Sequence, residues 1–294
     1  MHFSPMHVSK GNVYMLRRLF LSLACAALLP AQPQRIVSTA PSITEMLYAL
    51  GLGDRVAGVT RFCRYPPEAR LKPKIGDYVN PNLEAIASLK PDLVIIQTNP
   101  VRLRERLVNM HLRTIEVDQQ SIAGIYASIR AVGEAAGVSD RAEKLIDSIR
   151  SGLDAVHARA AVLKPVRVMF VIGRSQGRLD GLVVVGRASY LNEVIRTAGG
   201  ENVFHDAMAP YPNVSLEEVM ARNPEVILDM GDMSDTVSVT DQHKHEVVAL
   251  WDRVGTVDAV KHHRVFAIAS DMYVVPGPRA VDAAQAIFDM LRNK

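Results

Sequence analysis

Two stretches of this chain carry the same pattern at a fixed offset. NLEAIASLKPDLVI begins at Asn82 and SLEEVMARNPEVIL begins at Ser215, so that their Leu-Glu pairs and their prolines recur 133 positions apart. Both stretches start with a good helix N-cap, and each short helix should stop before its proline, because the residue before proline avoids the α region. The apolar run after each proline is typical of a short buried parallel strand. The chain therefore contains a helix–strand unit twice.

The repeat extends upstream and downstream of these stretches. Sequences starting at Ser42 and Ser189 predict further helices, each ending at glycines that precede an acidic residue and a valine. Apolar runs predict a strand before each of these helices and a third strand after each unit. Each half then reads β-α-β-α-β, the pattern of a parallel sheet flanked by helices. The expected strands are 35–39, 92–97 and 113–118 in the first half, and 166–173, 225–230 and 264–271 in the second.

A single long helix is predicted between the halves. Apolar residues follow helical spacing over 139–163, Ser139 can cap the start, and Lys164-Pro165 closes the segment. At 1.5 Å per residue this helix would be roughly 37 Å long, enough to bridge two lobes. We therefore expect an α/β fold of two similar parallel-sheet lobes, 35–137 and 166–294, joined by one long backbone helix. Small ligands commonly bind in the cleft between lobes.

The first 31 residues have the features of an N-terminal extension and a signal peptide. Arg17-Arg18 precede an apolar segment, Leu19 to Leu29, that is too short to span a bilayer, and cleavage could follow Ala31. The paired arginines fit either the Sec or the twin-arginine (Tat) export route, and Met15 is an alternative start. Cys25 is disfavoured as a lipid anchor, because Ser22 stands where a lipobox usually has leucine. We expect a periplasmic protein.

Removal of this segment changes the charge balance. It contains three basic residues and no acidic one, so 31 basic residues face 31 acidic residues in the rest of the chain. A neutral chain gives no bulk electrostatic reason to bind nucleic acid. Cys63 would be alone after cleavage and cannot form an internal disulfide, so we expect it to be a small buried side chain.

Aromatic residues are concentrated in the predicted loops. In open α/β sheets, ligands contact the loops at the carboxyl ends of the strands. Such loops carry five of the chain's few aromatic side chains. This grouping favours a shared ligand-binding wall over five side chains that each only cover part of the hydrophobic core. Two of the tyrosines are again 133 positions apart and should face each other across the cleft. The five residues are Phe62, Tyr65, Tyr78, Tyr211 and Tyr273.

Several motifs together resemble one protein family. RIVSTAPSITEMLYALGLGDRVAGVTRFCRYPPEA, NLEAIASLKPDLVI, GGENVF, YPNVSLEEV and PGPRAVDAA are similar in order and coverage to the periplasmic binding proteins of cobalamin and ferric-siderophore importers, especially the cobalamin-binding branch. The resemblance covers about 35–294 as one Fe/B12 periplasmic-binding domain. It implies a helical-backbone binding protein, monomeric and without a cofactor, that delivers its ligand to a dimeric ABC permease driven by a cytoplasmic ATPase.

The resemblance also implies roles for individual residues. Tyr78, Tyr211 and Gln97 occupy ligand-contact positions where the cobalamin-binding branch has tryptophan. Asp271 matches a ligand-contact aspartate, but Val275 replaces the arginine that accompanies it. Glu84 and Glu217 match glutamates that dock the binding protein onto arginines of the permease. Each glutamate should also complement its helix dipole.

The sequence is compatible with several classes of ligand. Flat aromatic walls suit cobalamin or a related corrinoid, which has apolar faces, amide arms and one internal phosphate. An anionic catecholate siderophore would need several convergent arginines, and a heme-binding protein of the same family is a further alternative. Arginines in or near the loops keep the siderophore alternative open: Arg61, Arg64, Arg174, Arg178 and Arg187.

Metal binding and catalysis are the remaining classes of function to consider. His243, His245 and the pair His262-His263 could contribute to a zinc site, but they lie in polar stretches typical of solvated helix ends and loops, so we expect no metal site. Nucleotide-binding and hydrolase motifs are missing from the sequence, and capping or turn roles suffice for Asp118, Asp229 and Asp232. The sequence therefore favours a binding protein over an enzyme.

Overall fold

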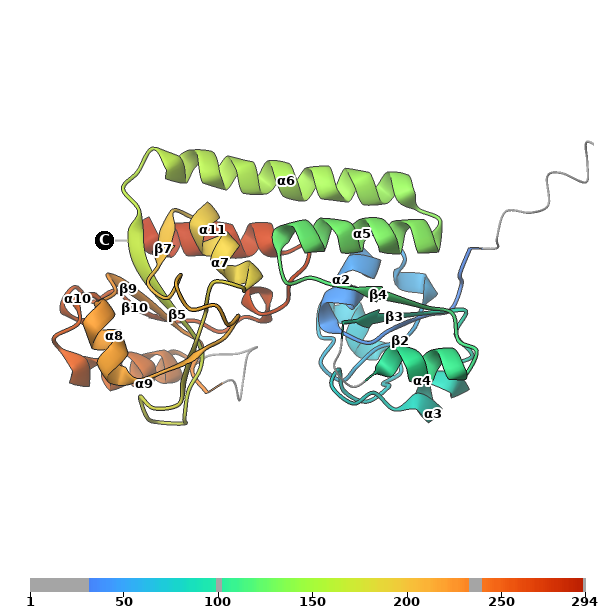
Figure 1. Ribbon diagram of the computed structural model, residues 1–294, viewed down its shortest axis with the longest axis horizontal. Helices are drawn as coiled ribbons and strands as arrows, with labels where there is room; N and C mark the ends of the chain where they lie inside the picture. Colours follow the sequence, from blue (N-terminus) through green and yellow to red (C-terminus); the bar gives the residue numbers. More distant parts are fainter. Residues whose placement is uncertain (1–31, 99–101, 233–239, 293–294) are drawn as a thin grey trace, which may run out of the picture. The chain divides into compact units, whose positions relative to one another are not determined.

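Parallel sheets organise both halves of the chain, as the repeat predicts. The computed structural model describes residues 32–98, 102–232 and 240–292. Residues 33–294 form one compact unit, and Figure 1 shows its helices and strands. The N-terminal half contains a four-stranded sheet in the order β2-β1-β3-β4, with all neighbours parallel. Its strands are β1 (Ile36–Ser38), β2 (Val56–Gly58), β3 (Leu93–Gln97) and β4 (Thr114–Val117).

The C-terminal half repeats this order and adds to it. Strands β7, β5, β9 and β10 are neighbours in the same parallel arrangement as β2, β1, β3 and β4. The addition is an antiparallel pair, in which β6 joins the later part of β5 and β8 joins β6. The strands of this half are β5 (Val166–Gly173), β6 (Leu182–Val184), β7 (Gly200–Asn202), β8 (Asn213–Val214), β9 (Val226–Asp229) and β10 (Val265–Ala267).

Helices cover both faces of each sheet, which explains why the central strands are almost wholly apolar. In the N-terminal half, α2 (Pro41–Ala49) and α5 (Ile122–Ala136) cover one face, whereas α3 (Leu83–Ser88) and α4 (Leu103–Asn109) cover the other. In the C-terminal half, one face packs against α7 (Tyr190–Thr197) and α11 (Ala280–Arg292). The opposite face packs against α8 (Leu216–Arg222), α9 (Asp241–Trp251) and α10 (Asp258–Lys261). Short 3₁₀ turns are η2 (Gly53–Arg55), η3 (Pro67–Leu71), η4 (Asp252–Val254) and η5 (Asp271–Tyr273).

The long helix between the halves is present as α6 (Ser139–Ala161). It packs along α5, α7 and α11, as Figure 1 shows for α5 and α11. Ser139 is the first helical residue and does not cap it, because the N-cap position falls on Val138. The division into lobes at 35–137 and 166–294 stays a prediction about domain boundaries.

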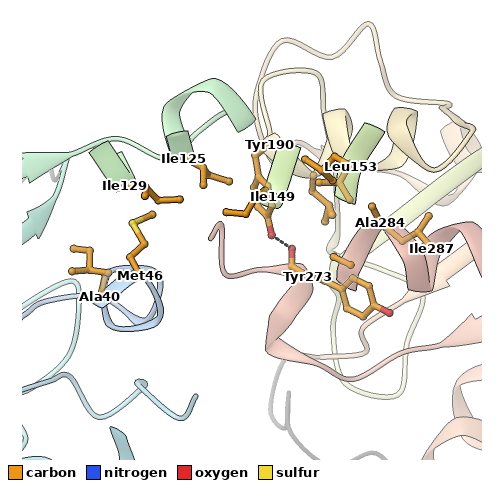
Figure 2. Packing of buried hydrophobic residues seen from close by; sticks show 14 of the residues in the cluster. Ala40, Met46, Ile125, Ile129, Ile149, Leu153, Tyr190, Tyr273, Ala284 and Ile287 are labelled. Carbon is orange, nitrogen blue, oxygen red and sulfur yellow. Dashed lines mark hydrogen bonds between the residues drawn. The ribbon is translucent and has the colours of Figure 1, made fainter. Parts of the chain in front are cut away.

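One hydrophobic cluster runs through both halves. It joins the inner faces of both sheets to α2, α5, α6, α7 and α11. Figure 2 shows part of it, from Met46 and Ile129 on one side, through Ile149, to Ala284 and Ile287 on the other. Apolar burial contributes roughly 25 cal/mol per Å², so the cluster stabilises the two halves as a single packing unit.

The repeated helix starts are built as the sequence predicts. The Asn82 side chain accepts a hydrogen bond from the backbone N–H of Ala85, and Ser215 Oγ accepts one from Glu218. Both helices end before a proline, and the residues just before the two prolines, Lys90 and Asn223, share positive φ values of 46° and 45°. These two residues are also 133 positions apart, so the backbone repeats even at this left-handed turn.

Candidate functional site

A cavity of about 680 Å³ lies between loops from both halves. The N-terminal half contributes the start of α2, the connection between β2 and α3, the last residue of β3, and the segment after β4. The C-terminal half contributes the start of α7, the loop before β8, and the segment around η5. This placement follows the rule that loops at the carboxyl ends of parallel strands form the binding crevice. Its lining residues are Pro41, Ser42, Phe62, Arg64, Tyr78, Gln97, Gln119, Gln120, Ala188, Ser189, Tyr190, Pro210, Tyr211, Asp271, Val274, Val275 and Pro276.

Most of the ligand-contact candidates from the sequence line this cavity. Phe62, Tyr78, Gln97, Tyr211 and Asp271 do so, although their contact with a ligand stays a prediction. The tyrosines separated by 133 positions thus reach the same cavity from opposite halves.

Two predicted tyrosines lie outside the cavity. Tyr65 lines a smaller adjoining hollow of about 120 Å³, which we call the side recess. Tyr273 is 4% exposed and its ring makes a T-shaped contact with Phe170, with 5.6 Å between ring centroids. Its backbone carbonyl accepts a hydrogen bond from the Tyr190 hydroxyl (Figure 2). Tyr273, the last residue of η5, therefore supports the cavity from the core, where its ring packs against Phe170.

Exposed aromatic rings form part of the cavity wall. Phe62 and Tyr78 meet edge to face, with 5.7 Å between ring centroids, and the Arg61 guanidinium lies 4.9 Å from the centroid of Phe62. On the C-terminal side, Ser189 Oγ donates to the Tyr211 hydroxyl at 3.2 Å. These contacts hold large apolar surfaces open to a cavity, as expected where a bulky ligand binds.

Buried amide and hydroxyl groups form the inner wall. Ser42 Oγ donates to the Gln119 side-chain carbonyl at 2.7 Å, and the Gln119 amide lies 3.4 Å from the Met46 sulfur. Because these groups satisfy one another, the buried polar surface adds no unpaired dipole to the cavity. Sequence reasoning missed Gln119 and Gln120. Their place directly after a predicted strand end was the available signal.

A charged cluster ties the two halves together beside the cavity. Arg279 donates to Asp271 Oδ1 at 3.0 Å and to Glu45 Oε2 at 2.9 Å, and its guanidinium lies 4.2 Å from the ring centroid of Tyr65. Glu45 comes from α2 in the N-terminal half, whereas Arg279 precedes α11. Burial raises the pKa of Glu45 to about 7, although the hydrogen bond from Arg279 opposes this shift. Asp271 was a candidate from the sequence, whereas Arg279 and Glu45 were not predicted.

Most of the loop arginines already have partners or lie away from the cavity. Arg174 is buried against Asp229 at 3.0 Å, Arg61 pairs with Asp77, and Arg178 pairs with Asp180. Arg187 is exposed and does not line the cavity. Among the five arginines considered from the sequence, Arg64 alone lines the cavity.

The Asp229 side chain has a larger structural role than a turn. Besides Arg174, it accepts hydrogen bonds from the Trp251 indole N–H at 2.7 Å and from the backbone N–H of Gly231. Cys63 is buried, as expected, within hydrogen-bonding distance of Thr44 and Thr60, and burial raises the pKa of its thiol.

The docking candidates Glu84 and Glu217 are exposed in the first turns of α3 and α8. Hydrogen bonds from the backbone and from Ser215 lower the pKa of Glu217.

Within the described ranges, no group of three His, Cys, Asp or Glu side chains could hold a metal ion. None of the helices in the same ranges combines the length and apolarity needed to cross a bilayer. Cys25 and the proposed cleavage point lie outside the described residues.

Residues 36–272 match the model of the family described as periplasmic binding protein. The vitamin B12-binding protein of Pectobacterium atrosepticum is 32% identical over 268 residues, which cover 89% of each chain. The ABC transporter substrate-binding lipoprotein YvrC of Bacillus subtilis is 30% identical over 265 residues, covering 88% of this chain and 80% of that protein.

Solved structures of binding proteins also superpose on this chain. The vitamin B12-binding protein BtuF of Vibrio cholerae superposes with a TM-score of 0.75 at 26% identity, covering 90% of this chain and 98% of that one. The heme-binding protein RhuT of Roseiflexus sp. RS-1 superposes with a TM-score of 0.73 at 28% identity, covering 88% and 99%. Fold, cavity position and sequence agree: this chain belongs to the periplasmic binding protein family.

Proposed function

We propose that this protein captures cobalamin or a related corrinoid in the cavity and delivers it to an ABC permease. Family membership makes the chain a substrate-binding component of an ABC importer and not an enzyme. The identity of the ligand is the proposal. It is supported by B12-binding names among the relatives and by the aromatic wall of the cavity.

The main support for a corrinoid ligand is the charge of the cavity. Among the described residues, two charged side chains line it, Arg64 and Asp271, and Asp271 is paired with Arg279. A triply anionic ferric catecholate needs several convergent cations, whereas a corrinoid offers apolar faces, amides and a single phosphate. The described residues therefore favour a corrinoid over such a siderophore.

Calorimetric titration of the purified mature protein with cyanocobalamin tests the proposal. We expect saturable one-to-one binding at micromolar or lower concentration. Absence of heat and of any spectral change in that range would exclude the corrinoid.

Heme is the second candidate, favoured by two phenol groups. Tyr78 and Tyr211 line the cavity, and a tyrosine can serve as an axial ligand of heme iron. Titration with hemin checks this alternative. Tight binding with a visible spectrum that changes in Tyr78→Phe or Tyr211→Phe would favour heme, whereas a spectrum unchanged in both variants would count against it.

We further propose that Glu84 and Glu217 dock the protein onto the permease. They are exposed at equivalent positions of α3 and α8, so two equivalent acids could meet two equivalent basic pockets of a symmetric permease. Replacement of both by lysine should leave ligand affinity and folding nearly unchanged. Uptake, or stimulation of the permease ATPase in liposomes, should fall sharply. The matched control is Glu134→Lys with Glu246→Lys, at exposed helix positions elsewhere. Full uptake by the docking variant would reduce both glutamates to helix-dipole partners.

The form of the exported protein completes the proposal. We infer that residues 1–31 are removed on export through the Sec or Tat route, and that the mature chain acts in the periplasm as a monomer. N-terminal sequencing of the secreted protein and light scattering check these points. An uncleaved or lipid-modified N-terminus, or a stable dimer, would contradict them.

A further inference from the structure

Arg64 stands apart from the other charged groups around the cavity. Its guanidinium has no hydrogen-bond or ion-pair partner among residues 32–98, 102–232 and 240–292, although it lines both the cavity and the side recess. The other cavity-lining charge, Asp271, is held by Arg279 at 3.0 Å. Among the described residues, Arg64 therefore gives the cavity an exposed positive charge that no protein group holds.

The side recess adds to this positive environment. Arg64, Arg70, Ser270 and Asp271 are among the residues that line it, and Arg279 pairs with Asp271. Arg70 donates its Nε–H to the Arg64 backbone carbonyl at 3.0 Å, which fixes the loop that carries Arg64. At about 120 Å³ the recess has room for several water-sized groups. Such an opening suits a small anionic group attached to a larger ligand in the main cavity.

We propose that Arg64 recognises an anionic group of the ligand, a phosphate or a carboxylate, where the cavity meets the side recess. Arginine offers a fork of donors that matches such groups bidentately. For a corrinoid, an inference that rests on the proposed function, the group is the phosphodiester of the nucleotide loop. Arg64 would then be a specificity-determining residue that distinguishes complete corrinoids from those lacking this loop.

Two ligands and four proteins test this role. Affinities for cyanocobalamin and for dicyanocobinamide, which lacks the phosphate-containing loop, are measured with the wild type, Arg64→Gln, Arg64→Lys and the control Arg178→Gln. Arg178 pairs with Asp180 and does not line the cavity. We expect the wild type and the control to prefer cyanocobalamin about tenfold or more, since a charge-assisted hydrogen bond has about that effect. The preference should fall toward unity in Arg64→Gln and be partly restored in Arg64→Lys.

The possible outcomes separate this inference from the proposed function. If cyanocobalamin binds and its preference over dicyanocobinamide is the same in Arg64→Gln, the role of Arg64 is overturned while the corrinoid proposal stands. If neither corrinoid binds the wild type, the corrinoid proposal fails, and the same comparison is made with hemin and its dimethyl ester, which lacks the carboxylates. A preference for hemin that Arg64→Gln removes supports Arg64 as the anion-recognising residue. An unchanged preference, or no binding of either, overturns it.

Discussion

Ile96 and Asp229 occupy equivalent positions in the two halves, yet one side chain is apolar and the other is charged. Each lies in the central strand that follows the repeated helix, at the 133-residue offset. Ile96 is buried among apolar side chains of the outer face of its sheet. Asp229 is equally buried but holds Arg174 and Trp251. The repeated backbone thus fixes where a side chain lies and leaves open what it interacts with.

The same contrast holds at the cavity. The strands and helix starts repeat, so both halves deliver loops to one place. The charges do not repeat: the N-terminal half presents Arg64, which has no side-chain partner in the described part of the chain, and the C-terminal half presents Asp271 already bound by Arg279. A duplicated scaffold has therefore diverged at its loops, where ligand selectivity arises.

Asp229→Ala tests the contrast at the strand ends and should have the largest effect. It leaves the Arg174 guanidinium buried without its counter-charge and the Trp251 N–H without its acceptor. Breaking a buried pair in this way costs about 3–5 kcal/mol, which denaturant titration would measure. By comparison, Ile96→Val at the equivalent position should cost about 0.5–1.5 kcal/mol.

The control for Asp229→Ala is Asp147→Ala, which breaks the exposed pair with Arg150. Its cost should stay within about 1 kcal/mol. A cost for Asp229→Ala no larger than that of the control would show that the buried pair contributes little, and the chemical contrast with Ile96 would have no energetic consequence.

Glu45→Gln tests the charged contact between the halves. Because the pKa of Glu45 is about 7 in the folded protein, above its ordinary value of 4.5, folding takes up a proton between these values. The wild type should therefore lose stability as pH rises from about 5 to about 8, by the order of 2 kcal/mol from this group. The variant lacks this loss. Unfolding free energies of both proteins at the two pH values measure the difference.

Glu134→Gln, at an exposed position of α5, serves as the control and should follow the wild type at both pH values. If the gap between the wild type and Glu45→Gln is the same at pH 5 and pH 8, Glu45 is ionised throughout. The contact would then be a permanent ion pair with Arg279.

Replacing Tyr78 or Tyr211 by alanine tests the symmetry of the cavity wall. Each removes an aromatic surface from one side, and we expect each to weaken cyanocobalamin binding about tenfold, or about 1.4 kcal/mol. Tyr126→Ala, on α5 and outside the cavity, should leave the affinity unchanged. A loss confined to one of the two cavity variants would show that one half dominates binding.

Much of this architecture could be predicted because it depends on local patterns. The two N-caps, the apolar strands and the long helix follow from cap residues, prolines and hydrophobic period. Phe62, Tyr78 and Tyr211 could be assigned to one rim because parallel strands carry their ends to the same edge. Tyr273 shows the limit: whether a loop side chain points to the cavity or to the core depends on packing against Phe170, which is distant in sequence.

The charged contacts lay beyond prediction for the same reason. Glu45 and Arg279 are 234 positions apart, and nothing local marks them as partners. The state of each arginine also depends on tertiary neighbours. Arg174 and Arg64 are both arginines in or near predicted cleft loops. Arg174 is nevertheless paired with the buried Asp229, whereas Arg64 lines the cavity.

The core cluster that runs from α2 through α6 to α11 has a mechanical consequence. Rotating the halves apart would expose apolar surface of this cluster, so we expect no low-cost hinge within the described residues. We therefore expect the width of the mouth to be set when the chain folds, so that little ordering entropy is lost on capture. A permease that receives this protein should then sense occupancy through the ligand at that mouth.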